Sequence, residues 1–215
     1  MMSGSDLSDV PLVHVDTDLI VLDKPAGLLA VPGRGPDKQD CLSARVQARW
    51  ADARVVHRLD MATSGLMLMA RGAESQRRLS QAFEAREIGK QYLAVVHGLI
   101  AAAQGQDWQS IDLPLAVDWP QRPRQTVDLQ RGRPSQTRWR VLEQAGQTTR
   151  LLLEPITGRS HQLRVHLQAI GHPIVGDALY GLPEPPGRLL LHACRLNLIH
   201  PGSGQPVSFE SAAPF

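Results

Sequence analysis

The stretch from His57 to Leu66 has the residue types of a reactive site at the edge of an apolar core. It joins two apolar segments that are predicted to be strands, Val55–Leu59 and Leu66–Ala70. Asp60 therefore falls where a strand ends and a Thr-Ser-Gly turn begins, a position that holds a side chain rigidly and still lets it reach a ligand. A carboxylate there can act as a nucleophile. The alternative is that it only accepts backbone hydrogen bonds in an Asx turn.

Four further segments combine charged or aromatic side chains with apolar residues. They are Lys24-Pro25-Ala26-Gly27, Lys90-Gln91-Tyr92-Leu93-Ala94, Thr157-Gly158-Arg159-Ser160-His161-Gln162-Leu163-Arg164-Val165-His166 and Leu189-Leu190-Leu191-His192-Ala193. Together with His57–Leu66, they resemble in the same order the sequence motifs of the RluA-type RNA pseudouridine synthases. Five motifs in the family's order are far more specific than one, and they span nearly the whole chain.

The resemblance implies a residue for each chemical role. Asp60 is expected to be the catalytic nucleophile, and Arg164 is expected to support its ionised form through a salt bridge. Tyr92 is expected to stack on the uracil and to take or give a proton. Leu190 is expected to form part of the pocket wall. Arg58 is expected to fill the gap that the flipped-out uridine leaves in the RNA, or to contact phosphate.

Considered without the resemblance, these residues have ordinary structural alternatives. Arg164 lies about 100° from Leu163 around a predicted helix, at the rim of the buried face, where an exposed arginine is common. Tyr92 lies on a predicted strand, where a tyrosine ring usually packs in the core, and the same holds for Leu190. The physical reason to expect a cation beside Asp60 is that an apolar pocket pushes a carboxyl group towards its neutral form.

Pseudouridylation moves uracil from an N1 to a C5 linkage on the same C1′ atom of the ribose. Because no atom is gained or lost, the reaction needs no redox cofactor, and the sequence contains no Gly-x-Gly-x-x-Gly motif, P-loop or metal-ligand cluster. His161 and His166 do not share a helical face and are not expected to bind zinc. His57 and His192 are expected to make structural hydrogen bonds. We therefore expect an isomerase that uses no cofactor and no metal.

Within that family, the chain is most similar to the short dual-specificity members. The supporting features are its length, the phrase Asp118-Trp119-Pro120 followed by Arg122-Pro123, and the expected lack of an N-terminal S4-type RNA-binding domain. This resemblance implies two substrates in structured RNA, uridine 746 of 23S ribosomal RNA and uridine 32 of tRNA. The alternatives are an enzyme for large-subunit rRNA only, a non-catalytic RNA-binding ribosome-assembly protein, and a nucleoside-hydrolysing glycosidase. Glycosidases commonly use a pair of carboxylates, and the motifs hold no second acid.

The distribution of charge adds a candidate RNA-binding segment. The net charge of +2 does not by itself indicate a nucleic-acid binder. Residues 118–140, however, contain six arginines against two aspartates, and arginine suits bidentate phosphate contacts and stacking on bases. The expected RNA contacts are Arg34, Arg122, Arg124, Arg131 and Arg133. The alternative is a solvated Arg-rich loop with no ligand.

The elements expected around these residues are mostly strands. We predict strands at 12–15, 19–23, 55–59, 66–70, 91–96, 111–117, 137–143, 149–155, 189–199 and 207–210. Helices are predicted after an Asp40 cap, over 73–88, and over 160–170 with Ser160 as N-cap and Gly171 just past the end. Because helices and strands do not alternate regularly, the pattern predicts an α+β fold with a mixed, mostly antiparallel sheet and flanking helices. The resemblance makes this the pseudouridine synthase catalytic fold.

The bulk properties are those of an ordinary globular protein. The 215 residues are expected to comprise a flexible N-terminus, 1–11, and a single catalytic domain, 12–215. The composition is typical of soluble proteins, with no apolar run long enough to cross a bilayer. The polar start does not resemble a secretory signal, and Cys41 and Cys194 have no metal or redox spacing, so a cytoplasmic location is expected. The expected partner is structured RNA, bound by a monomer.

Overall fold

The computed structural model describes residues 7–101, 107–183, 185 and 187–215. The chain divides into two compact units, one formed by Met1–Gly89 with Ala193–Pro214 and one by Lys90–His192 with Phe215. Of the predicted flexible N-terminus, residues 1–6 lie outside the described residues. Val10 is buried, and its backbone N–H donates to the Leu7 carbonyl at 3.0 Å.

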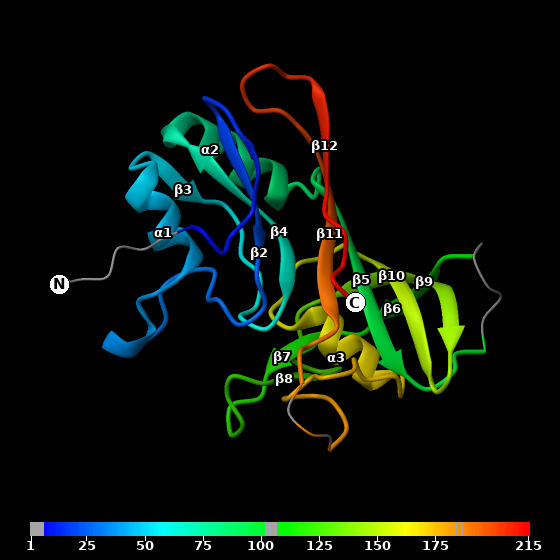
Figure 1. The fold of residues 1–215 in the computed structure, drawn as a ribbon. Helices are drawn as coiled ribbons and strands as arrows, with labels where there is room; N and C mark the ends of the chain where they lie inside the picture. The colour runs from blue at the N-terminus through cyan, green and yellow to red at the C-terminus, as the bar shows by residue number, and fades with distance from the viewer. Residues whose placement is uncertain (1–6, 102–106, 184, 186) are drawn as a thin grey trace. The chain divides into compact units, whose positions relative to one another are not determined.

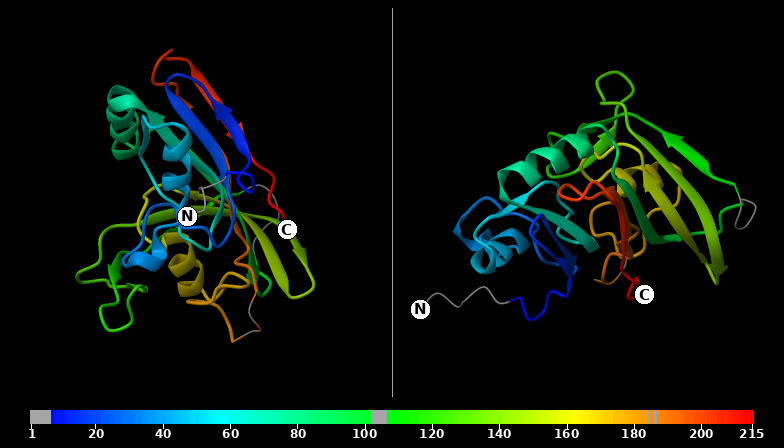
Figure 2. Two further views of the ribbon diagram at one scale, coloured as in Figure 1. Left: turned by 60° about the vertical axis from the view of Figure 1, so that its left-hand side comes forward. Right: turned by 90° about the horizontal axis from the view of Figure 1, so that it is seen from above.

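The first unit is built on a sheet that runs in the order β1-β2-β4-β11, with β12 beside β11 and β3 beside β4 (Figure 1). The strands are β1 (Leu12–Val15), β2 (Leu19–Lys24), β3 (Ala53–Val55), β4 (Ser64–Arg71), β11 (Leu191–Ile199) and β12 (Pro206–Glu210). The helices are η1 (Pro36–Lys38), α1 (Leu42–Arg49) and α2 (Gly72–Glu84). Helix α2 packs against β3 and β4, and α1 packs against β3 (Figure 2).

The core of this unit follows from the apolar runs of β2 and β4. Alternate residues of the two strands, among them Leu19, Val21, Leu66 and Leu68, form one cluster with Leu79 of α2. Their intervening neighbours are also fully buried, so both faces of these strands are covered. Runs that are apolar without alternation are typical of such strands.

Local details of the first unit differ from three of our predictions. The strand predicted at 55–59 ends at Val55, because the His57 ring rather than the backbone continues the pairing with β4. Helix α1 begins after Cys41, not after an Asp40 cap, since the Asp40 carboxylate instead binds the Arg45 guanidinium at 2.7 Å. Helix α2 ends at Glu84 rather than at 88.

The second unit contains an antiparallel sheet in the order β5-β10-β9-β6 and a separate hairpin, β7-β8. Its elements are β5 (Gly89–His97), β6 (Gln109–Asp112), β7 (Leu115–Val117), β8 (Gln125–Val127), β9 (Gln136–Ala145), β10 (Thr148–Pro155) and α3 (Gln162–Ala169). The predicted hairpin of β9 and β10 is confirmed. Helix α3 packs against β8, β9 and β10, and its Val165 is buried with Leu115 and Tyr180.

Two predictions in the second unit are wrong in detail. The single strand predicted at 111–117 is two strands, β6 and β7, that pair with different partners. Helix α3 is preceded by His161 in the left-handed region, with φ 54°, so Ser160 is not its N-cap. Gly171 has φ +85° just past the helix end, as the sequence predicted.

The predicted α+β class is confirmed, because helices and strands do not alternate regularly and most of the strand pairings within each unit are antiparallel. None of the helices in the described part of the chain is long and apolar enough to span a membrane.

Candidate active site

Asp60 lies in a turn between β3 and β4. Its backbone carbonyl accepts a hydrogen bond from Thr63 N at 3.1 Å, and its side chain is half-buried. The preceding residues are fixed by His57, whose Nε2 accepts from Leu68 N at 2.8 Å and whose ring stacks on Phe83. The structural role predicted for His57 is therefore confirmed. These contacts hold the Asp60 backbone at the edge of a rigid sheet, where a reactive side chain can be oriented.

Gly65 explains how this turn enters β4. Its φ is +111°, and a Cβ atom there would lie 2.3 Å from the Ala193 carbonyl oxygen of β11. No side chain fits at that distance, so glycine is required for β4 to approach β11 directly after the Asp60 turn.

Lys24 ties the Asp60 turn to the end of β2. The side chain is fully buried, and its Nζ donates to the carbonyl oxygens of Pro25 at 2.9 Å, Leu28 at 2.8 Å and Met61 at 3.1 Å. Gly27 N also donates to Met61 O, at 2.8 Å. Both turns are therefore fastened to each other next to Asp60.

Lys24 also contributes charge to this turn. Burial lowers the pKa of its ammonium group to about 8, and the nearby Asp60 carboxylate opposes that effect. Below pH 8 the group is mainly charged and can serve all three carbonyls. From the sequence, Lys24 was assigned only to a turn. The available signal was its position two residues after Leu22, the last residue of an apolar run, because a lysine buried there needs hydrogen-bond partners.

Arg58 and Arg34, two residues predicted to contact RNA, are both exposed in the first unit. Arg58 lies two residues before Asp60, and Arg34 lies in the loop that precedes η1. Exposure leaves both guanidinium groups accessible to a polyanion, as their predicted roles require.

Arg164 is the central charged residue of the second unit. It lies on α3 and is only 4% exposed. Its Nε and Nη2 donate to the two carboxylate oxygens of Asp177, each at 2.7 Å, and the Asp177 side chain is fully buried. This is a buried bidentate pair, a geometry that fixes the plane of the guanidinium.

Asp177 is itself held in place by backbone groups. Its Oδ1 also accepts from Leu179 N at 2.9 Å and from Tyr180 N at 3.1 Å. Burial acts to raise the pKa of Asp177, but the hydrogen bonds and charge of Arg164, together with the two backbone bonds, outweigh it and lower the pKa below its ordinary value. Asp177 therefore stays ionised near neutral pH.

Tyr180 connects this ion pair to the β7–β8 hairpin, which carries Arg122 and Arg124. Its hydroxyl accepts from Gln125 N of β8 at 2.7 Å and is hydrogen-bonded to His161 Nδ1, also at 2.7 Å. The guanidinium groups of Arg124 and Arg164 lie over its ring, at 5.3 Å and 5.0 Å from the centroid. The structure thus brings Arg124, predicted to bind RNA, together with Arg164, predicted to be catalytic.

Neither Asp177 nor Tyr180 was among the residues singled out from the sequence. Arg164 and Asp177 are 13 residues apart, and no local pattern marks their contact. The available signal was general: an arginine on a mostly buried helix requires a counter-charge from somewhere in the fold.

Tyr92 and Leu190 lie on or beside β5 in the same unit as Arg164. Tyr92 is half-buried and pairs with Leu153 of β10. The Leu190 carbonyl accepts from Val95 N at 3.1 Å, and Leu190 N donates to the Val175 carbonyl at 3.0 Å. These backbone bonds hold both side chains on a rigid strand framework, while Asp60 belongs to the other unit.

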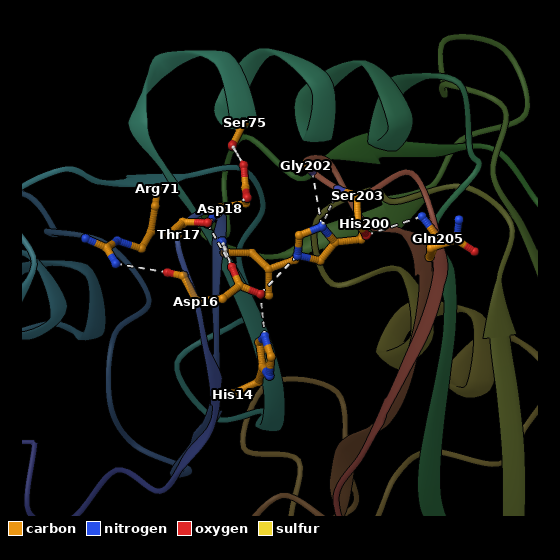
Figure 3. A network of polar contacts seen from close by, with 11 residues as sticks. His14, Asp16, Thr17, Asp18, Arg71, Ser75, His200, Gly202, Ser203 and Gln205 are labelled. Atoms are coloured by element: carbon orange, nitrogen blue, oxygen red, sulfur yellow. Dashed lines mark hydrogen bonds and ion pairs between the residues drawn. The ribbon is translucent and has the colours of Figure 1, made fainter.

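A second cluster of ionisable groups, in the first unit, surrounds Asp16 (Figure 3). Asp16 Oδ2 accepts from His14 Nε2 at 2.6 Å and from His200 Nε2 at 3.0 Å, while Oδ1 accepts from Asp18 N and Leu19 N. Asp16, Asp18 and His200 have the spacing of metal ligands. Each carboxylate oxygen of Asp16 already accepts two hydrogen bonds, however. We therefore interpret the cluster as a structural lock, a set of polar contacts that holds the β1–β2 turn to the β11–β12 turn.

We expect Asp16→Asn to lower the free energy of unfolding by about 2 kcal/mol at pH 7, because an amide nitrogen would then face the two imidazoles. Hydrogen bonds to His14, His200 and backbone N–H groups overcome partial burial and depress the pKa of Asp16. The stabilising contribution is therefore present above about pH 4 and is lost as the pH falls further. Urea unfolding of both proteins at pH 7, 5 and 3 measures this difference.

The exposed Asp37 provides the control, since Asp37→Asn is expected to change stability by less than about 0.5 kcal/mol. A difference between wild type and Asp16→Asn that stays constant down to pH 3 would contradict the proposed lock.

Comparison with known proteins assigns the chain to a family. The family model described as RNA pseudouridylate synthase matches residues 18–169 of the chain. The chain belongs to this family. The dual-specificity RNA pseudouridine synthase RluA of Escherichia coli K12 is 46% identical over 208 residues, which cover 95% of this chain and 93% of the relative. Its counterpart from Yersinia pestis is also 46% identical, over 95% of this chain and 99% of the relative.

Solved structures of RNA pseudouridylate synthases share the fold. The structure titled Human RNA Pseudouridylate Synthase Domain Containing 1 has a TM-score of 0.79 and 28% identity, covering 100% of this chain and 87% of the other. Human RNA Pseudouridylate Synthase Domain Containing 4 has a TM-score of 0.74 at 22% identity, over 95% and 88% of the two chains, and supports the fold alone. The predicted catalytic fold and family are confirmed, and the protein is an RNA-modifying isomerase.

Proposed function

We propose that this pseudouridine synthase has dual specificity and isomerises a uridine in 23S rRNA and a uridine in the tRNA anticodon stem-loop. The supporting observation is the 46% identity over 95% of the chain to relatives that carry the name dual-specificity RNA pseudouridine synthase. The expected positions are uridine 746 of 23S rRNA and uridine 32 of tRNA. We further propose that the enzyme acts in the cytoplasm as a monomer.

The proposed chemistry centres on Asp60. The uridine is extruded from its stack, at a cost of a few kcal/mol, and Asp60 acts as the nucleophile that splits the isomerisation into two steps. The C1′–N1 bond breaks, the uracil turns, and a C1′–C5 bond forms. The proton that C5 loses must leave, and N1 must gain one, so that the product has the composition of the substrate.

Tyr92 and Arg164 have supporting roles in this proposal. Tyr92 stacks on the uracil and takes or gives a proton through its hydroxyl group. Arg164 supports the ionised form of Asp60. Its guanidinium is held in a fixed plane by the two hydrogen bonds that Nε and Nη2 donate to Asp177. Leu190 contributes to the pocket wall, and the exposed arginines bind the RNA backbone.

The test is a product assay with purified protein on unmodified transcripts of both RNAs. We expect pseudouridine at one position in each RNA, detected by mass spectrometry, and no release of free uracil. Matched transcripts with cytidine at the two target positions serve as controls and should remain unmodified. Modification of the 23S fragment alone would limit the protein to rRNA. Binding of RNA without pseudouridine would favour a non-catalytic RNA-binding protein, and free uracil would indicate a glycosidase.

A further inference from the structure

Trp119 stands apart from the other aromatic side chains of the chain. The four Trp, three Phe and two Tyr residues all lie in the described part of the protein, and Trp119 is the one that is exposed. Two-thirds of its surface, 67%, is accessible to solvent. An indole ring left in water in this way commonly marks a binding surface.

The ring is carried by a short, hydrogen-bonded turn between β7 and β8. Asp118 N donates to the Arg124 carbonyl at 3.0 Å, and Arg124 N donates to the Gln121 carbonyl at 3.0 Å. The Arg122 guanidinium lies 4.6 Å from the centroid of the Trp119 ring, in cation–π geometry. Arg122 therefore orients the ring from one side, while most of the ring surface remains in solvent.

The β7–β8 hairpin that carries Trp119 and the segment that follows it are positively charged. Arg122, Arg131 and Arg133 are exposed, and none of them makes a salt bridge within 4.0 Å to another described residue. The two aspartates of residues 118–133 instead accept hydrogen bonds from backbone N–H groups of the turns in this segment. Asp118 Oδ1 accepts from Gln121 N, and Asp128 Oδ1 accepts from Gln130 N and Arg131 N.

The hairpin is also connected to the buried ion pair of α3. Gln125 N donates to the Tyr180 hydroxyl, and the Tyr180 ring lies beneath both Arg124 and Arg164. Within the second unit, Trp119 is therefore presented on a support that is continuous with Arg164. A nucleobase stacked on Trp119 would therefore be held at a fixed position relative to Arg164, the residue that we propose supports the ionised form of Asp60.

We propose that Trp119, braced by Arg122, is a stacking platform for an unpaired nucleobase of the substrate RNA close to the target uridine. An exposed aromatic ring with an arginine beside it matches a base flanked by a phosphate, and stacking on an aromatic ring is independent of base identity. This inference rests on the proposed function, because it takes a structured RNA with loop nucleotides as the ligand.

The test measures the affinity of the full-length protein for the fluorescently labelled tRNA anticodon stem-loop. Trp119→Ala is expected to raise Kd by about 5- to 140-fold, the range found when one stacked base is lost. Trp119→Phe keeps an aromatic face and should bind within about threefold of wild type. Trp50, which has Arg49 4.7 Å over its ring in the first unit, supplies the control, and Trp50→Ala should leave Kd unchanged.

A cycle with abasic RNAs separates stacking from a general loss of affinity. Each loop nucleotide is replaced in turn by an abasic one, and Kd is measured with wild type and with Trp119→Ala. At one loop position, the abasic RNA should weaken binding to wild type and have no further effect on the variant. The slope of log K against log salt should be unchanged for Trp119→Ala and reduced by about one for Arg122→Gln.

The proposal is overturned if Trp119→Ala binds RNA within twofold of wild type. It is also overturned if, at every loop position, the loss of affinity caused by Trp119→Ala adds to the loss caused by the abasic nucleotide. These outcomes concern binding alone. They are distinguishable from failure of the proposed function, which would show as an absence of pseudouridine with the wild-type enzyme.

Discussion

Asp60→Asn is expected to lower the rate of pseudouridine formation by about 10⁴-fold or more, while the Kd for RNA changes by less than about threefold. An amide has the shape of the carboxylate but is a far weaker nucleophile, and removal of the nucleophile from other enzymes has effects of this size. Single-turnover assays with enzyme in excess over transcript measure the chemical step, and anisotropy with the same RNA measures binding.

Asp52→Asn is the matched control for this prediction. Asp52 is an exposed carboxylate of the same unit, paired with Arg71 at 3.1 Å, and its loss should leave turnover within twofold of wild type. If Asp60→Asn retains more than about a hundredth of the wild-type rate, the nucleophile must be another group, and the assignment from the sequence motif is wrong.

Asp177→Ala is expected to lower the free energy of unfolding by about 3–5 kcal/mol, the range for breaking one side of a buried ion pair. The substitution leaves the Arg164 guanidinium, which is 4% exposed, without its bidentate partner. It also removes the acceptor of Leu179 N and Tyr180 N. Urea unfolding monitored by circular dichroism measures the loss, with the m-value as a check that the transition remains two-state.

Further variants separate folding from the positioning of Arg164. Asp177→Asn keeps an oxygen acceptor for the backbone and should destabilise less than Asp177→Ala. The double substitution Asp177→Leu with Arg164→Met removes both charges together, so it should recover part of the stability while turnover stays low. Full turnover in that double variant, or a loss below about 1 kcal/mol in Asp177→Ala, would contradict the role that we give to this pair.

The proposed RNA-binding and catalytic groups of the second unit share one network of contacts. Tyr180 accepts a hydrogen bond from the β7–β8 hairpin and lies beneath Arg164, which donates two hydrogen bonds to Asp177. A single side chain, Tyr180, therefore contacts both the hairpin and Arg164.

The sequence by itself determined the features whose causes are local. The β9–β10 hairpin was predicted because two strand-forming runs flank a short turn, and Gly171 was placed after α3 because a residue past a helix end often needs a positive φ. The family was predicted from five motifs in order and is confirmed by the match over residues 18–169. The sites of chemistry, by contrast, were assigned by resemblance and stay predictions.

Only the tertiary structure decided what depends on partners far along the chain. The strand predicted at 55–59 stops at Val55 because the His57 ring takes the backbone N–H of Leu68. Lys24 is buried because three carbonyls from two separate turns converge on its ammonium group. Asp177 meets Arg164 because helix α3 and the following loop fold together. Burial makes such long-range polar contacts obligatory, and no local pattern of residues encodes which partner will satisfy them.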